Sequence, residues 1–152
     1  MDFKFTTGPN WDENYGGDGN GNLVFDGNNV SVPVMGSYNI TVNLNDMTWM
    51  AMPYSFGIIG TATPGGWDND TDMTYNYQEG YWEYTGNLIA GALKFRLNDA
   101  WTVNYGSPNN TDFIAYLDDP GAHSVESAGN YHVTFKIDDT DPSIAYYTVE
   151  PL

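Results

Sequence analysis

A tryptophan in a polar loop is the residue of this chain best suited to meet a ligand. Trp67 lies in the segment TATPGGWDNDTD (residues 61–72), where Gly, Asn and Asp predict a loop and a large apolar ring is hard to bury. A flat aromatic ring matches the C–H face of a sugar, and planar polar groups match its rim of hydroxyls. Trp67 is therefore a candidate sugar platform; the alternative is a ring folded back on the protein.

Two cations form the next group of candidates. Lys94 and Arg96 alternate with apolar residues in the segment LKFRL (residues 93–97), so both should project from the face opposite the core. One interpretation is that they contact a ligand. The other is that they pair with nearby carboxylates of this acidic chain, which would contribute little to stability.

Three further aromatic and polar positions have two interpretations each. Trp101 heads a predicted strand, where it suits core packing as well as binding. Asn104 has an amide that could bind a hydroxyl or cap a turn, and the turn is favoured. Trp82 lies between tyrosines in a predicted hairpin (74–77 and 81–84) and is expected to face the core or a neighbouring ring.

Acidic residues in the Trp67 loop raise the question of calcium. Asp68, Asp70 and Asp72 alternate there, and a second acidic run covers residues 138–141. Calcium prefers several oxygens on a curved loop, but neither run has the Gly and Glu spacing of the twelve-residue calcium loop. The residues 68–72 are thus a weak candidate, and we expect neither a metal nor any other cofactor.

Signals for catalysis are poor. His123 and His132 are too few and too far apart for a zinc triad, and neither a nucleophile elbow nor a phosphate loop is found. The 20 acidic residues leave room for a pair of catalytic carboxylates across a groove, but nearly all of them lie in predicted turns. We expect no enzymatic activity.

Charge and composition narrow the partners and the location. The net charge of −16 disfavours nucleic acid and anionic membrane surfaces, because both carry negative charge. Without cysteine the chain has neither disulfides nor thiolate metal sites. No apolar run has the length of a transmembrane helix, so we expect no membrane insertion, and the start MDFKFTT is not that of a signal peptide.

The chain repeats part of itself. The segment FKFTTGPNWDENYG (residues 3–16) matches LKFRLNDAWTVNYG (residues 93–106) at six positions with one constant offset of 90. Tyr, Trp, Phe, Thr, Val and Ile dominate between frequent turns, which predicts an all-β fold. Clean alternation in SYNITVNL (37–44) recurs in NYHVTFKI (130–137), and Pro33 suggests that residues 30–35 form an edge strand.

The two copies differ in extent. We expect a complete unit at residues 54–152 and a truncated one at residues 1–53, because the second copy has residues 54–92 before its repeated strand. A sheet that lacks its first strands exposes edges and apolar faces. We expect another chain or the neighbouring unit to support it, by self-association or strand swapping; alternatively, packing on the second domain suffices.

The motifs in order resemble a known family, the SusE/SusF starch-binding lipoproteins of Bacteroidetes. The similarity covers residues 54–152 and, in truncated form, 1–53. It rests on Gly57-Ile58-Ile59-Gly60, Ala62 to Asp68 (ATPGGWD), Asp72-Met73, the Gly80/Trp82 hairpin, Ala90 to Arg96 (AGALKFR), Trp101, Asn104-Tyr105-Gly106, Ala128 to Tyr131 (AGNY) and Tyr147 to Glu150 (YTVE).

The resemblance implies an immunoglobulin-like antiparallel β-sandwich in tandem that binds polysaccharide, an α-glucan such as starch, without cleaving it. It also implies a parent lipoprotein exposed on the outer membrane. The binding site in this family would correspond to Trp67, to Lys94 or Arg96, and to Trp101 or Tyr105. The first copy has no counterpart of Trp67. The alternative function is a structural or adhesive module that assembles through the incomplete first unit; a glycoside hydrolase fragment is more distant.

Overall fold

The computed structural model describes residues 1–152 and is built from strands, which confirms the all-β class. Two compact units follow each other, Met1–Tyr54 and Ser55–Leu152. The boundary lies one residue from the division between residues 53 and 54 that the repeat predicts. The chain has no helix of the length and apolar character needed to cross a membrane.

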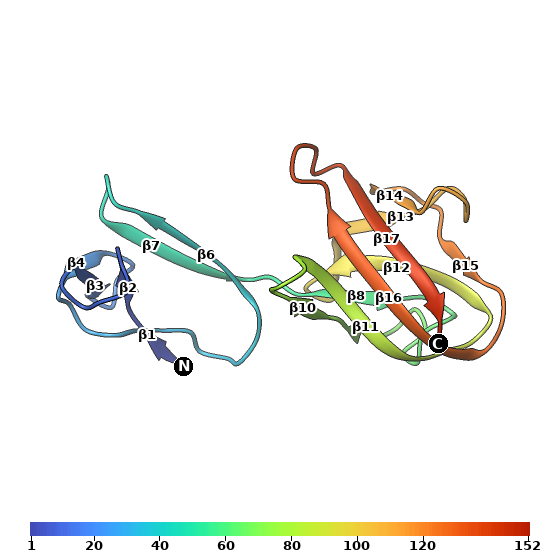
Figure 1. The fold of residues 1–152 in the computed structure, drawn as a ribbon, viewed down its shortest axis with the longest axis horizontal. Helices are drawn as coiled ribbons and strands as arrows, with labels where there is room; N and C mark the ends of the chain where they lie inside the picture. Colours follow the sequence, from blue (N-terminus) through green and yellow to red (C-terminus); the bar gives the residue numbers. More distant parts are fainter. The chain divides into compact units, whose positions relative to one another are not determined.

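The second unit contains one antiparallel sheet of ten strands (Figure 1). The hydrogen-bonded order is β10-β11-β16-β17-β14-β13-β12-β8-β9, and β15 pairs with β12. The strands are β8 (Phe56–Ile59), β9 (Thr71–Asp72), β10 (Thr74–Asn76), β11 (Tyr81–Leu88), β12 (Gly91–Leu97), β13 (Ala100–Gly106), β14 (Ile114–Leu117), β15 (His123–Val125), β16 (Gly129–Ile137) and β17 (Ile144–Pro151).

This sheet folds over on itself around an aromatic core. Phe95 of β12 stacks on Phe135 of β16, with ring centroids 4.5 Å apart, although the two strands are not hydrogen-bonded neighbours. Phe56 of β8 also contacts Phe135, at 4.8 Å, and all three side chains are fully buried. Figure 1 shows β11, β16 and β17 crossing over β8 and β12. The arrangement is a sandwich of antiparallel layers; its immunoglobulin-like topology stays a prediction.

Period-two alternation explains which side chains enter this core. Val133 and Phe135 of β16 are completely buried, whereas their neighbours in sequence point to the other side of the strand. Trp82 of β11 is 5% exposed, and its ring centroid lies 5.9 Å from that of Phe56. The expectation that Trp82 faces the core is therefore confirmed.

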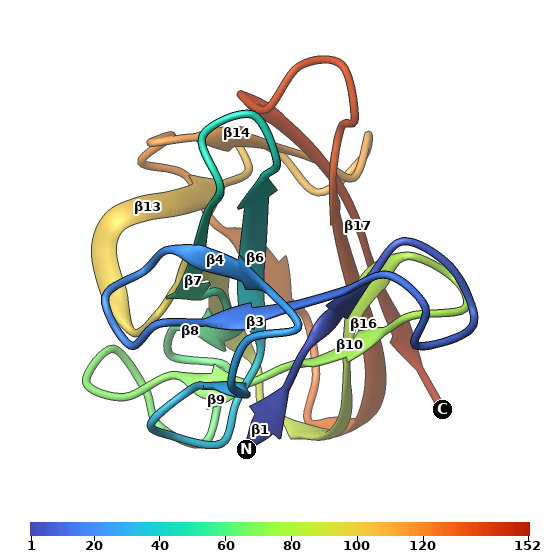
Figure 2. The ribbon, with the colours of Figure 1, turned by 90° about the vertical axis from the view of Figure 1, so that its left-hand side faces the viewer.

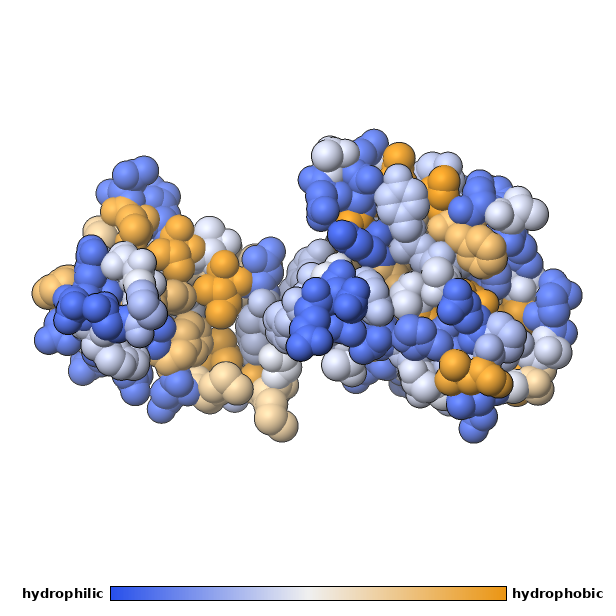
Figure 3. All heavy atoms as spheres, in the orientation of Figure 1, coloured by the Kyte–Doolittle hydropathy of each residue, from blue (hydrophilic) through white to orange (hydrophobic).

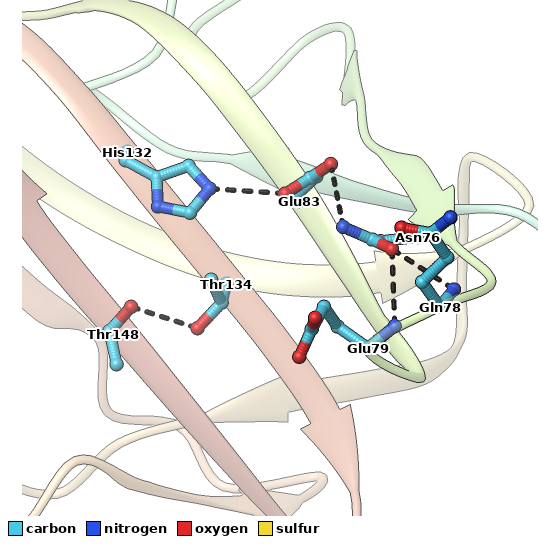
Figure 4. Close-up of polar contacts among 7 residues, drawn as sticks. All are labelled: Asn76, Gln78, Glu79, Glu83, His132, Thr134 and Thr148. Carbon is cyan, nitrogen blue, oxygen red and sulfur yellow. Dashed lines mark hydrogen bonds and ion pairs between the residues drawn. The ribbon is translucent and has the colours of Figure 1, made fainter.

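The outer face of β11, β16 and β17 carries a polar network (Figure 4). His132 Nε2 lies 3.2 Å from Glu83 Oε2, and the other oxygen of Glu83 accepts a hydrogen bond from Asn76 Nδ2 at 3.4 Å. Thr134 and Thr148, on the paired strands β16 and β17, share a hydrogen bond between their hydroxyls at 2.8 Å. These polar side chains form hydrogen bonds with one another on a partly solvated surface.

The first unit contains three small antiparallel sheets, and β3 and β4 face the viewer in Figure 2. The sheets are β1 with β5, β2-β3-β4, and the hairpin β6 with β7. The strands are β1 (Asp2–Phe3), β2 (Phe5–Thr6), β3 (Asn14–Gly17), β4 (Leu23–Phe25), β5 (Val30–Ser31), β6 (Tyr38–Asn43) and β7 (Thr48–Pro53).

The strand pairing of the first unit recurs in the second. Phe5 of β2 lies opposite Tyr15 of β3, as Phe95 of β12 lies opposite Tyr105 of β13. The hairpins follow the same rule: β6 pairs with β7 up to Pro53, as β16 pairs with β17 up to Pro151. The sequence repeat therefore has a counterpart in strand register.

The first unit leaves β6 exposed, including the side that carries its apolar residues. β6 pairs with β7 alone, whereas β16 also pairs with β11 on its other edge. Ile40 and Val42 are 43% and 38% exposed, although Val133 and Phe135 of β16 are completely buried. Figure 3 shows apolar side chains at the surface of this unit. We call the side of β6 that carries Ile40 and Val42 the open face.

Two predictions of strand extent are wrong. The strand expected over residues 30–35 covers only Val30–Ser31, because Pro33 has no amide hydrogen to continue the ladder. The hairpin strand expected over residues 81–84 extends to Leu88, since β11 pairs with β16 along its whole length. Strand β15 has only three residues, which give too short a pattern to predict.

Because Phe135 is buried and Ile40 is exposed, their replacement by alanine should change the stability of the protein by different amounts. Phe135→Ala should lower the free energy of unfolding of the second unit by about 3–5 kcal/mol, because it leaves a cavity in the aromatic stack. Ile40→Ala should cost less than about 1 kcal/mol, because the side chain is already largely in water. Urea denaturation followed by circular dichroism measures both. Equal losses would mean that the open face is covered in solution.

Candidate functional site

Trp67 and Trp101 lie side by side on the second unit. Their ring centroids are 6.1 Å apart with planes tilted by 35°, which is within the range of paired aromatic rings. Trp67 is 41% exposed and Trp101 is 47% exposed. The structure therefore does not bury either ring in the core, and their role as a sugar platform stays a prediction. We call these two rings the tryptophan pair.

The loop that carries Trp67 is built from tight turns between β8 and β9. The amide of Gly66 donates to Thr63 O at 3.1 Å, and Gly66 has a φ of 61°, a conformation that favours glycine. At Gly65 a Cβ atom would lie 2.1 Å from Asn69 O, so that position has no space for a side chain. The sequence GGW thus forms a compact loop that presents the tryptophan ring.

Lys94 lies beneath the ring of Trp101. Its Nζ donates to Asp119 O at 2.6 Å and is 5.7 Å from the ring centroid of Trp101. The residue is 8% exposed, and burial lowers the pKa of Lys94 although Asp119 and Asp118 act in the opposite direction. The predicted projection from the non-core face is observed, but the charged end is covered instead of reaching solvent.

Arg96 lies beneath the same ring and forms a buried ion pair. Its Cζ is 4.9 Å from the ring centroid of Trp101, and its Nε donates to Asp70 Oδ1. The side chains of Arg96 and Asp70 are 6% and 1% exposed. Gly57 lies opposite Arg96 in β8, where a Cβ would be 2.9 Å from Asp70 Cβ. Its missing side chain makes room for the carboxylate.

Asp70 faces a hollow with few compensating charges. The hollow has a volume of about 430 Å³ and is lined by Asp68, Asn69, Asp70, Asp72, Arg96 and Asp99. Burial raises the pKa of Asp70 to about 6; Arg96 opposes this rise and Asp99 adds to it. Asp70 Oδ2 is buried without a hydrogen-bond partner. The guanidinium of Arg96 is therefore the main group that stabilises the ionised carboxylate of Asp70.

Asp70 of the Trp67 loop and the two histidines turn to different partners. No three His, Asp or Glu side chains of the chain are arranged to hold a metal ion. Asp70, the central residue of the candidate calcium loop, turns toward Arg96. His123 is buried and lies 3.1 Å from Tyr147 Oη through its Nδ1, whereas His132 pairs with Glu83. The two histidines therefore have separate partners.

Asn104 forms the turn that supports Trp101. Its Nδ2 donates to Trp101 O at 3.1 Å and to Asp118 Oδ1 at 3.0 Å, and the residue is 8% exposed. In the first unit Asn14 Nδ2 donates to Trp11 O at 3.2 Å and to an aspartate in the same way. Of the two interpretations for Asn104, the structural one is therefore observed, and its predicted contact with a ligand is not supported.

Tyr105 belongs to the core, so its prediction as a ligand-contacting ring is wrong. It is 2% exposed, its hydroxyl donates to Pro142 O at 2.5 Å, and its ring centroid lies 5.3 Å from that of Phe135. Alternation along β13 is the physical reason, since Tyr105 is opposite the core residue Phe95. Trp101 is thus the second aromatic residue of the site.

Backbone and side-chain atoms near Lys94 pack closely against Gly106, so a substitution there tests how tightly the site is packed. A Cβ at Gly106 would lie 2.3 Å from the backbone oxygens of Asp119 and Gly121 and 3.0 Å from Lys94 Cε. Gly106→Ala should therefore destabilise the second unit by about 1–3 kcal/mol, as overpacking does. Gly129→Ala is the matched control, because its Cβ would meet only a side-chain atom, at 3.4 Å. Thermal unfolding of both variants compares them; equal melting temperatures would contradict the expectation.

Comparison with protein-family models, curated proteins and solved structures found no match to this chain. Its function must therefore be inferred from its own residues. The features available for that inference are two half-exposed tryptophan rings in contact, and two buried cations beneath one of them.

Proposed function

We propose that the chain binds polysaccharide without cleaving it and that the tryptophan pair is the platform. The observation that carries this proposal is the contact between two large rings, each over 40% exposed, on one surface. Large apolar side chains gathered at a surface mark interaction sites, and flat rings complement the C–H faces of sugars. A pair of tilted rings offers two such faces to successive residues of a glycan.

The polar contacts to the glycan come from the loop around Trp67. Asp68 and Asn69 are exposed beside the ring, and their planar carboxylate and amide can bind sugar hydroxyls. Lys94 and Arg96 contact Trp101 from the protein side, because they are buried while the ring is half exposed. Their role is to hold the ring, in place of the direct contact expected from the sequence.

Asp70 is not placed as a catalytic acid. A glycosidase needs a carboxylic acid that reaches the glycosidic oxygen. Asp70 has the raised pKa of such an acid, but its side chain is 1% exposed and engaged by Arg96. It is therefore not placed to protonate a substrate, which agrees with a binding role.

The resemblance to the SusE/SusF family supports the same function and makes it more specific. By this resemblance we propose an immunoglobulin-like domain that binds an α-glucan such as starch on the surface of a bacterial outer membrane. The net charge of −16 suits a solvated surface that avoids anionic partners. Several weak sites along a tandem protein would bind a polymer through avidity.

Removing one ring tests the proposal. Trp67→Ala should abolish the retardation of the protein in affinity gels that contain starch or pullulan, because one ring gives less contact area. Trp11→Ala is the matched control, since Trp11 is 68% exposed and has no partner ring in the first unit. No retardation of the wild-type chain on α-glucans, xylan or other polysaccharides would contradict glycan binding, and release of sugars would contradict a role without catalysis.

The open face of β6 favours a second candidate function, assembly with another copy of the chain. The edge of β6 away from β7 has no strand partner, and apolar side chains are exposed along the strand. Two such faces can cover each other, or their edges can pair. A structural or adhesive module that assembles through its first unit would use this surface.

A charge placed on the open face tests this second candidate. Sedimentation velocity should show concentration-dependent association of the wild-type chain, and Val42→Lys should abolish it because the new charge would be desolvated. Thr41→Lys is the control, because Thr41 points to the opposite side of β6. A wild-type chain that stays monomeric up to the highest concentration would exclude the second candidate.

A further inference from the structure

The two rings of the tryptophan pair come from distant parts of the sequence. Trp67 lies on the loop between β8 and β9, and Trp101 lies on β13. The start of the loop is tied to the sheet, since the amide of Ala62 donates to Ala92 O and the amide of Ile89 donates to Ala62 O, both at 3.0 Å. The loop ends in β9, which pairs with β8. Residues 67–70 lie between these two anchors, so a further contact of this part of the loop with the sheet can set the spacing of the rings.

The ion pair of Asp70 and Arg96 is such a contact. Asp70 follows Trp67 by three residues in the loop, whereas Arg96 belongs to β12 and contacts the ring of Trp101. A single guanidinium thus touches the carboxylate of one segment and the ring of the other. Guanidinium groups suit this double role, because they can bind a carboxylate and lie against an aromatic face at once.

The first unit supplies a partial comparison. The position of Arg96 in the repeat is occupied there by Thr6. The tryptophan at the corresponding position, Trp11, is 68% exposed, against 47% for Trp101. The ring without an arginine beneath it is thus the more exposed of the two.

We propose that the buried Asp70–Arg96 ion pair positions the tryptophan pair, so that the platform for the glycan exists only while this ion pair is intact. The proposal rests on the proposed function for its biological meaning, but the ring pairing itself is measurable without a glycan. Asp70 and Arg96 act through the rings and are positioning residues; neither contacts the sugar.

The groups around Asp70 set its protonation state. Arg96 faces it from β12, Asp99 from the turn before β13, and Asp68 and Asp72 line the same hollow. Because burial raises the pKa of Asp70 to about 6, protonation between pH 7 and pH 5 removes its charge. In water an aspartate has a pKa of about 3.9. Protonation of Asp70 therefore favours the arrangement in which its carboxyl group is buried against Arg96, and acidification to pH 5 should leave the rings paired.

Circular dichroism measures the pairing of the rings directly. Two coupled indoles produce an exciton couplet, and Trp67→Phe identifies the part of the signal that comes from this pair. At pH 7 the wild-type chain should show the couplet, and Asp70→Ala should lose most of it, because it removes the oxygen that accepts from Arg96. Asp68→Ala is the matched control, because it removes one carboxylate from the same loop and leaves the ion pair in place. The wild-type couplet should persist on acidification to pH 5.

A double variant covers the case in which Asp70→Ala does not fold. Asp70→Leu with Arg96→Met replaces the ion pair by apolar groups, a change that buried pairs commonly tolerate. The folded double variant should lack the couplet and bind α-glucan about tenfold more weakly than wild type, as loss of positioning predicts. A folded double variant that keeps the couplet would overturn the proposal. If the wild-type chain binds no glycan, the proposed function fails, yet the couplet still decides whether the ion pair positions the rings.

Discussion

The alternation of side chains along β12 is the constraint on which both the core and the site depend. This strand is hydrogen-bonded to β8, β13 and β15, so its register fixes that of its neighbours. Leu93 and Phe95 enter the core at 1% exposure, and the two cations between and after them take the opposite face. A shift by one residue would exchange the two faces and place both charges in the aromatic core.

Burial of both cations on one face needs explanation in a chain with 20 acidic residues. Most carboxylates lie in exposed turns, where water stabilises them, whereas Lys94 and Arg96 are less than 10% exposed. Each cation has one oxygen partner, and both share the ring of Trp101. The electron-rich face of an indole compensates part of the lost hydration. The ring is thus part of the electrostatic support of the cations, and the cations support the ring in turn.

Much of the fold could be predicted from residue patterns, because strand alternation is a local property. The burial of Phe95 and Trp82 and the position of the Trp67 loop follow from such patterns. The partner of Arg96 could not be predicted, since alternation fixes the side on which Arg96 lies but not which carboxylate folds over it. Gly57 is the one local signal, because a residue without a side chain next to Arg96 leaves space for a group above the sheet. Tyr105 matches the family motif, but its position in the alternation of β13 places its ring in the core.

Comparison of the two copies of the repeat distinguishes residues that build the fold from residues that belong to the candidate site. The turn formed by Asn104 recurs at Asn14, and in both units an aspartate with positive φ closes it, Asp26 at 53° and Asp118 at 57°. In both units the asparagine amide donates to a backbone carbonyl, which any residue supplies, so the turn geometry does not require the tryptophan. Arg96, which the first unit replaces by Thr6, is not needed for the turn. Since a buried ion pair adds little to stability compared with apolar packing, the pair of Asp70 and Arg96 is best explained by what it positions.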